Sequence, residues 1–258
     1  MNMALSFPPA IHNEIIRMSR RQRRAIKPDN ILGNFSDIVS LLSAIAKLDG
    51  VIMQMVMFEA IKSNPDYELL WRPKIPITDS AERLAAGGDY LSCMRTDLPF
   101  CGTVSRLVEV DFVAINRVTG VATAAESKRG GELDSGKRHK IVENLVRVKM
   151  ILADYLRSIG YAEVRSAEVA LVVYYGTWSL KPIPTITRST IDAHFGAAVT
   201  PMVAMAADLI RREMMGNTLP VLTTLLEAYA GQLDAPEMAD TREEFIRILS
   251  EIVKPPSK

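Results

Sequence analysis

Residues 108–128, VEVDFVAINRVTGVATAAESK, form the stretch that decides the fold. Val, Ile and Phe are enriched over Arg106–Asn116, and a second apolar run covers Val121–Lys128. Residues of these types favour extended strands. The short segment Val118-Thr119-Gly120 separates the two runs, so we expect a β-hairpin here.

The strongest helical pattern in the chain follows this hairpin. Gly130-Gly131 opens a loop, Asp134 or Ser135 can cap the helix, and Gly160 ends it. Apolar residues recur at steps of three and four, at Ile141, Leu145, Val148, Leu152, Tyr155 and Ile159. The other side is charged, so we expect a half-exposed helix whose solvent face carries Lys140, Glu143, Arg147 and Asp154.

Three further segments complete the expected sheet and its first helix. The spacing of apolar residues from Ser36 predicts a helix with a break at Asp49-Gly50, a second helical run over Val51–Ile61 and an end at Asn64-Pro65. The run Glu168–Tyr175 (EVALVVYY) is apolar except for its first residue and predicts a strand buried on both faces.

The remaining segments have weaker patterns. Tyr67–Ile77 predicts a strand at a sheet edge, because Pro73 and Pro76 cannot donate to a ladder, and Thr78–Phe100 has the composition of a loop. Helical segments are expected downstream, at about Thr190–Met215, Pro220–Leu233 and Thr241–Val253. The order of elements predicts an α/β fold with a mixed sheet flanked by helices and a C-terminal helical extension.

Composition excludes several classes of protein. Of 258 residues, 48% are hydrophobic and 24% are charged, and 31 basic residues balance 30 acids to a net charge of +1, which excludes disordered, collagen-like and coiled-coil chains. Cys93 and Cys101 alone form neither a disulfide framework nor a four-ligand zinc site. The longest stretch without charge, Ala193–Ala207, is too short to span a bilayer, and no secretory signal is visible, so we expect a soluble cytoplasmic protein.

The charged residues of the hairpin are the candidate functional residues. Because strand residues alternate faces, Glu109 and Asp111 should point the same way, as should Glu126 and Lys128. Ionised groups in such apolar surroundings need compensation. Two explanations remain open at this point, a ladder of salt bridges across the hairpin or a site for a hard divalent cation with Lys128 beside it.

The segments VEVDF and AAESKRGG carry Asp111, Glu126 and Lys128. An acid, then 14 residues, then Glu-x-Lys on the next strand, followed by a helix and a buried strand, resembles the PD-(D/E)XK nuclease superfamily, whose fold is restriction-endonuclease-like. The similarity covers roughly Ile38 to Tyr175. Val110 stands where that family often has proline.

This resemblance implies a metal site. Asp111, Glu126 and the backbone carbonyl of Ser127 would hold Mg²⁺, with Mn²⁺ able to substitute, and Lys128 would orient or activate the attacking water. Many relatives add a glutamate from the helix before the first strand, and Glu59 matches that position, although it is equally readable as an exposed last-turn residue. Glu109 is a competing third carboxylate.

A second motif competes with this assignment. Residues 131–138, GELDSGKR, fit the P-loop pattern GxxxxGK between a strand and a helix. Arg138 replaces the Ser or Thr that would bind Mg²⁺, and the later strand ends in Tyr174-Tyr175-Gly176 without the partner acid. We therefore expect a polar turn and no nucleotide cofactor, with Lys137, Arg138 and Lys140 contacting DNA phosphates.

The segment from Arg17 to Lys27 carries six basic residues and no acid. It either forms a solvated helix face or neutralises a nucleic-acid backbone, with Arg20, Arg21, Arg23 and Arg24 as the contacts. These features predict a basic arm over 1–35, a PD-(D/E)XK-like core over 36–178, and a C-terminal helical region over 179–258 that packs on the core or forms a dimer interface.

Together they predict a metal-dependent nuclease, more specifically a deoxyribonuclease and endonuclease, that acts as a homodimer without membrane contact. Two alternatives from other classes stay open. The first is a nucleic-acid-binding or assembly subunit that kept the fold without catalysis, and the second and weaker one is a nucleotide hydrolase that uses the glycine loop.

Overall fold

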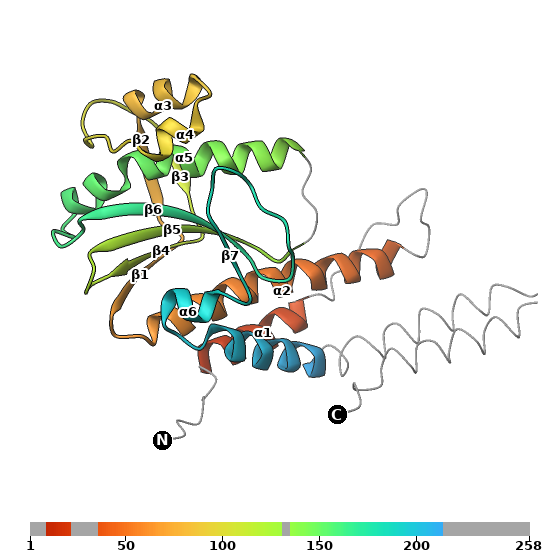
Figure 1. Cartoon of the computed structure of the whole chain (residues 1–258). Helices are drawn as coiled ribbons and strands as arrows, with labels where there is room; N and C mark the ends of the chain where they lie inside the picture. Colours follow the sequence, from red (N-terminus) through yellow and green to blue (C-terminus); the bar gives the residue numbers. More distant parts are fainter. Residues whose placement is uncertain (1–8, 22–35, 131–134, 214–258) are drawn as a thin grey trace, which may run out of the picture. The chain divides into compact units, whose positions relative to one another are not determined.

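A computed structural model describes residues 9–21, 36–130 and 135–213 (Figure 1). The chain divides into two compact units. One holds Gly50–Ala204, and the other holds the described residues that fall within Ser6–Asp49 and Met205–Lys258. The helices predicted over Pro220–Leu233 and Thr241–Val253 lie outside the described residues.

A five-stranded mixed sheet forms the centre of the first unit. Its strand order is β1-β4-β5-β6-β7, with antiparallel pairs from β1 to β5 and parallel pairs from β5 to β7. The predicted hairpin and the predicted buried strand are both confirmed. The strands are β1 (Tyr67–Trp71), β4 (Phe112–Asn116), β5 (Val121–Lys128), β6 (Ser166–Val173) and β7 (Thr185–Thr187).

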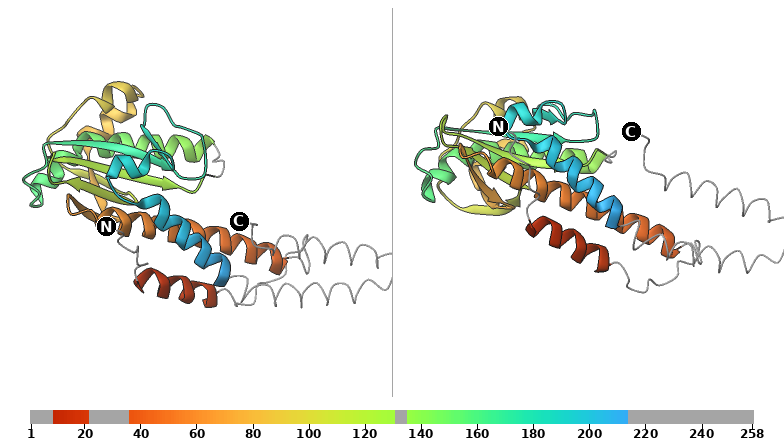
Figure 2. Two further views of the ribbon diagram at one scale, coloured as in Figure 1. Left: turned by 60° about the horizontal axis from the view of Figure 1, so that its bottom comes forward. Right: turned by 90° about the horizontal axis from the view of Figure 1, so that it is seen from below.

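Helix α5 (Ser135–Ser158) covers one face of this sheet, and residues 50–62 of α2 (Ser36–Lys62) lie along the other face (Figures 1 and 2). The core under α5 joins helix residues such as Leu145 and Leu152 to alternate strand residues such as Val113 and Ala124, all of them buried. Burial of this apolar area is the main favourable contribution to the free energy of folding. Helix α2 runs through Asp49-Gly50 without the predicted break, since a single helical glycine costs only about 1 kcal/mol.

Two predicted strands are each divided in the structure. The chain turns at Arg72 (φ 45°) and Pro73, which separates β1 from β2 (Lys74–Thr78). It turns again after β3 (Val104–Glu109), before β4 begins. β2 and β3 pair with each other in a separate two-stranded sheet. The two turning points are joined, because the Val110 amide donates to the Pro73 carbonyl at 3.3 Å.

The segment Thr78–Phe100, predicted as a loop, contains two helices, α3 (Asp79–Ala86) and α4 (Tyr90–Met94). Both are too short to show a periodic pattern. The carboxylate of Asp89 caps α4 by accepting from the Ser92 amide at 3.1 Å. Further along, the segment predicted as helical from about Thr190 contains α6 (Ile191–Phe195), a left-handed Gly196 and a helix over 199–213.

The second unit contains α1 (Pro9–Arg21), which buries Ile11 and Ile15, and residues 205–213 of the later helix. Arg17, at the start of the predicted basic run, pairs with Glu14 on the same helix. Within the part of the chain that the structure describes, no helix combines the length and apolarity needed to cross a bilayer. Cys93 is buried, Cys101 is exposed, and neither is in a disulfide.

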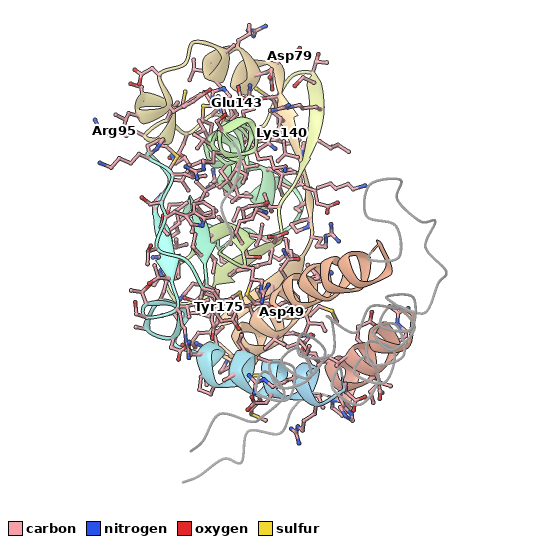
Figure 3. All side chains as sticks on the ribbon, turned by 90° about the vertical axis from the view of Figure 1, so that its right-hand side faces the viewer. Asp49, Asp79, Arg95, Lys140, Glu143 and Tyr175 are labelled. Carbon is pink, nitrogen blue, oxygen red and sulfur yellow. The ribbon has the colours of Figure 1, made fainter. Side chains whose placement is uncertain are left out.

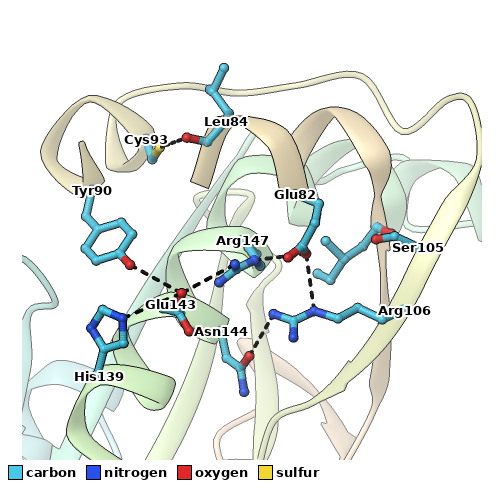
Figure 4. Close-up of polar contacts among 11 residues, drawn as sticks. Glu82, Leu84, Tyr90, Cys93, Ser105, Arg106, His139, Glu143, Asn144 and Arg147 are labelled. Atoms are coloured by element: carbon cyan, nitrogen blue, oxygen red, sulfur yellow. Dashed lines mark hydrogen bonds and ion pairs between the residues drawn. The ribbon is translucent and has the colours of Figure 1, made fainter. Parts of the chain in front are cut away.

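Arg147, predicted to face solvent, is buried instead, because α3 and α4 cover the outer side of α5 (Figure 4). Only 6% of its side chain is exposed. Its Nε lies 3.0 Å from a Glu82 carboxylate oxygen, and its Nη2 lies 3.5 Å from Glu143. Arg106 on β3 joins the same Glu82 oxygen at 3.3 Å, so one carboxylate ties β3 and α5 to α3.

Removal of Glu82 should therefore destabilise the fold. Glu82→Ala leaves the buried Arg147 charge poorly compensated, and we expect a loss of about 2–3 kcal/mol in the free energy of urea unfolding. Glu68→Ala is a matched control, because its carboxylate is as exposed (33% against 34%) but its partner Arg117 is 56% exposed. Equal effects of the two substitutions would contradict the assigned role of the Glu82–Arg147 pair.

Candidate metal-binding and catalytic site

The three residues predicted to carry catalysis lie at the same end of the sheet, where Glu126 pairs with Lys128 and the Asp111 carboxylate bonds Ser127 and Gln54. Asp111 lies one residue before β4 and opposite the end of β5, where Glu126 and Lys128 are located. Glu126 and Lys128 continue the alternation of Ala122 and Ala124, which pack in the core under α5. Their side chains therefore leave β5 on the α5 side of the sheet.

Asp111 is held by its backbone and by one carboxylate oxygen. Its amide donates to the Ala125 carbonyl at 3.1 Å, and its carbonyl accepts from the Arg72 amide at 3.0 Å. Oδ2 accepts from the Ser127 amide at 2.6 Å, the Ser127 hydroxyl at 2.8 Å and Gln54 Nε2 at 3.0 Å. Within residues 9–21, 36–130 and 135–213 no donor lies on Oδ1, so this oxygen is available to a ligand.

The backbone of Ser127 is oriented toward Asp111. Its amide donates to Asp111, whereas the carbonyl of the next residue, Lys128, accepts from the Tyr174 amide on the β6 side at 3.2 Å. The N–H and C=O of one strand residue point to the same side. The Ser127 carbonyl is therefore directed to the Asp111 side, as the resemblance predicts for a metal ligand.

Glu126 and Lys128 form an ion pair, with Nζ 2.5 Å from Oε1. Burial raises the pKa of the Glu126 carboxyl, the Asp111 charge raises it further, and Lys128 opposes both effects without cancelling them. The charges of Asp111 and Glu126 therefore oppose each other at this end of the sheet. A bound cation would reduce that repulsion.

Gln54 was not anticipated from the sequence, and it takes the place at Asp111 that the resemblance gave to a glutamate. Glu59 lies five residues further along α2, which turns it about 140° around the helix axis. Its carboxylate pairs with Lys62 at 3.9 Å and is not brought to Asp111 or Glu126. A glutamine after the apolar pair Ile52-Met53 carries no signal that distinguishes it from any other helix residue.

Glu109 does not share the orientation expected from strand alternation, because the chain bends at Val110 between β3 and β4. It ends β3 opposite Lys74, and its Oε1 accepts from Arg72 Nε at 2.8 Å. Its charge is the smallest of those acting on the pKa of Glu126. Glu109 therefore lies at the periphery of the candidate site.

The donors at this site suit a hard, oxygen-preferring cation. Among the described residues, no group of three or more His, Cys, Asp or Glu side chains is arranged to hold a metal ion. Two carboxylates, with a backbone carbonyl directed toward them, are nonetheless the kind of donor set that Mg²⁺ uses, since this ion keeps several waters. The absence of thiolate and imidazole donors from the set argues for Mg²⁺ or Mn²⁺ over zinc.

The predicted phosphate-binding residues divide into two groups. Lys137, Arg138 and Lys140 lie on the first two turns of α5, with Lys137 and Lys140 exposed (Figure 3 labels Lys140). Arg138 is half-buried, and its Nε has no hydrogen-bond partner in the described part of the chain. The predicted contacts in the basic arm, namely the side chains of Arg20 and Arg21 and the whole of Arg23 and Arg24, lie outside what the structure describes.

Comparison of this chain with protein-family models, with curated proteins and with solved structures finds no match. The chemistry of the site is therefore inferred from its own residues.

The raised pKa of Glu126 has a consequence for stability. The folded protein holds this proton more tightly than the unfolded chain, so the stabilisation is complete below the ordinary value of 4.5 and is lost as the pH rises through the raised value. Glu126→Gln stays neutral throughout. We expect this variant to be more stable than the wild type near neutral pH, in chelator, with the gain shrinking as the pH falls toward 4.5. Urea unfolding over that pH range measures it, and a variant that is less stable than wild type at neutral pH would contradict the assignment.

Proposed function

We propose that this chain is a metal-dependent nuclease that hydrolyses DNA phosphodiester bonds, of the PD-(D/E)XK type that its hairpin resembles. One observation carries the proposal. Asp111 and Glu126 lie where β4 begins and β5 ends, burial and then the Asp111 charge raise the pKa of Glu126, and Lys128 lies 2.5 Å from Glu126. A carboxyl group with a raised pKa next to a lysine is typical of functional sites.

Each residue has a role in this proposal. Asp111, through Oδ1, and Glu126 would hold one Mg²⁺ ion together with the Ser127 carbonyl. A metal ion at this position supplies Lewis-acid polarisation of the phosphate and lowers the pKa of a bound water. Lys128 orients that water and offsets negative charge that develops on the phosphate oxygens. Gln54 is a positioning residue, because its hydrogen bond fixes the rotamer of Asp111.

The order of elements supports the same assignment. An antiparallel hairpin, a helix and a strand parallel to β5 follow one another from β4 to β6, as the PD-(D/E)XK fold requires. We propose a restriction-endonuclease-like core on this basis, and a cytoplasmic homodimer with endonuclease activity, because cutting both strands of a duplex favours a two-fold pair of sites.

A second function is favoured by a specific observation. The three donors that the described residues supply to the Asp111 side chain converge on one oxygen, and Lys128 already neutralises part of the Glu126 charge. The hydrogen bonds to Asp111 and the Glu126–Lys128 ion pair also suit a structural role at the end of the sheet. The corresponding protein would bind nucleic acid without cutting it, and its binding would be salt-sensitive and would survive loss of these carboxylates.

Cleavage of supercoiled plasmid and of single-stranded DNA, in Mg²⁺ or Mn²⁺ against chelator, distinguishes the two functions. We expect Asp111→Asn, Glu126→Gln and Lys128→Ala each to reduce the cutting rate by about 100-fold or more, because each removes a ligand or the lysine that stabilises the transition state. Gel mobility and urea unfolding on the same samples show that the variants are folded.

Glu68→Gln is the control for this experiment, since it neutralises a carboxylate paired with Arg117 at the opposite end of the sheet. It should cut at the wild-type rate. Persistent metal-dependent cutting by both the Asp111 and the Lys128 variants, or DNA binding without any cutting by the wild type, would overturn the nuclease assignment.

A further inference from the structure

Tyr175 is an exposed aromatic side chain beside the candidate site. It follows β6 by two residues, and 47% of it is exposed to solvent. Its amide donates to the Arg129 carbonyl at 2.7 Å, and the preceding amide, of Tyr174, donates to the Lys128 carbonyl at 3.2 Å. Figure 3 labels Tyr175 in a view onto the end of the sheet. These bonds fix Tyr175 next to the residue that follows Lys128.

Two glycines, Gly130 and Gly176, allow the chain segments on either side of this position to approach closely. Gly130 has a φ of 131°, and a Cβ built on it would lie 2.5 Å from the Gly176 amide nitrogen and 2.7 Å from the Tyr175 carbonyl carbon. No side chain fits there, so the segments that leave β5 and β6 pack backbone against backbone. Tyr175 therefore lies at a close contact between these two segments, although it is outside the regular strand.

The ring of Tyr175 is oriented by its neighbours. The Arg129 guanidinium lies 5.9 Å from the ring centroid, within the range of a cation–π contact. The ring of Tyr174 meets it edge-on at 4.8 Å, with an interplanar angle of 85°. Tyr174 itself is buried, and its hydroxyl donates to the Thr200 carbonyl at 3.4 Å. Tyr174 is thus packed in the interior, whereas Tyr175 is partly exposed to solvent.

We propose that Tyr175 and Arg129 form a stacking platform for one unpaired nucleobase beside the scissile phosphate, an inference that rests on the nuclease function proposed above. An exposed aromatic ring next to a basic side chain is the combination that single-stranded nucleic acids recognise. Inside a continuous duplex both faces of each base are covered by neighbouring pairs. Only an unpaired, frayed or flipped base can stack on a protein ring.

The substrate class follows from this geometry. The preferred DNA carries an unpaired nucleotide at the cleavage position, as in a single strand, a flap or an open end. Stacking on the Tyr175 ring recognises the strand without reading its sequence.

Tyr175→Leu and Tyr175→Phe test the platform. Leucine keeps an apolar side chain but removes the π face, whereas phenylalanine keeps the ring. Fluorescence anisotropy in chelator gives the affinity for a single-stranded oligonucleotide and for its duplex, independently of cutting. We expect Tyr175→Leu to weaken single-strand binding roughly 5- to 100-fold and to leave duplex binding unchanged, with Tyr175→Phe close to wild type. A 2-aminopurine base in the strand reports stacking directly, through quenching that the leucine variant loses.

The control for charge is Arg117→Ala, at the turn between β4 and β5 at the other end of the sheet, which should not change the preference for single strands. Equal single-strand affinity of wild type and Tyr175→Leu, or equal losses for single strand and duplex, would overturn the platform. Metal-dependent plasmid cutting is measured on the same samples. If cutting persists while the affinities do not differ, the platform alone fails; if the wild type neither binds nor cuts DNA, the nuclease function fails with it.

Discussion

The hydrogen bonds that Asp111 accepts at the end of β5 hold two strands and a helix together at the candidate site. The chain leaves β3 at Glu109, bends, and enters β4 at Phe112, so the Asp111 backbone can extend the ladder no further. Its carboxylate bonds the next β5 amide, that of Ser127, at 2.6 Å and connects it to Gln54 on α2. This single side chain therefore joins a strand end, its neighbour and the helix on the opposite face.

The candidate site places charged groups where burial is unfavourable. Glu126 and Lys128 are partly buried, and repulsion from Asp111 adds to the burial that raises the pKa of Glu126. A polar interior of this kind reduces stability unless a ligand compensates it. The pair Glu82–Arg147 shows the contrasting case, since its buried guanidinium is compensated by two carboxylates within the protein and serves to join α3 to α5.

Local patterns predicted the elements that are long and regular. Helix α5 repeats apolar residues over several turns, the hairpin and β6 carry sustained apolar runs, and the alternation along β5 places Glu126 and Lys128 on one face as expected. Features set by tertiary contact could not be predicted. The bends at Arg72 and Val110 depend on pairing between β2 and β3, the burial of Arg147 depends on α3 and α4, and the approach of Gln54 to Asp111 joins residues 57 positions apart.

Anomalous diffraction from crystals of the protein grown or soaked with Mn²⁺ tests the central claim most directly. The account predicts a manganese peak bound by a carboxylate oxygen of Asp111, a carboxylate oxygen of Glu126 and the carbonyl oxygen of Ser127, at metal–oxygen distances of about 2.1 Å. It also predicts that the peak is lost in crystals of Glu126→Gln. A manganese ion bound elsewhere, or none at this position at millimolar Mn²⁺, would contradict it.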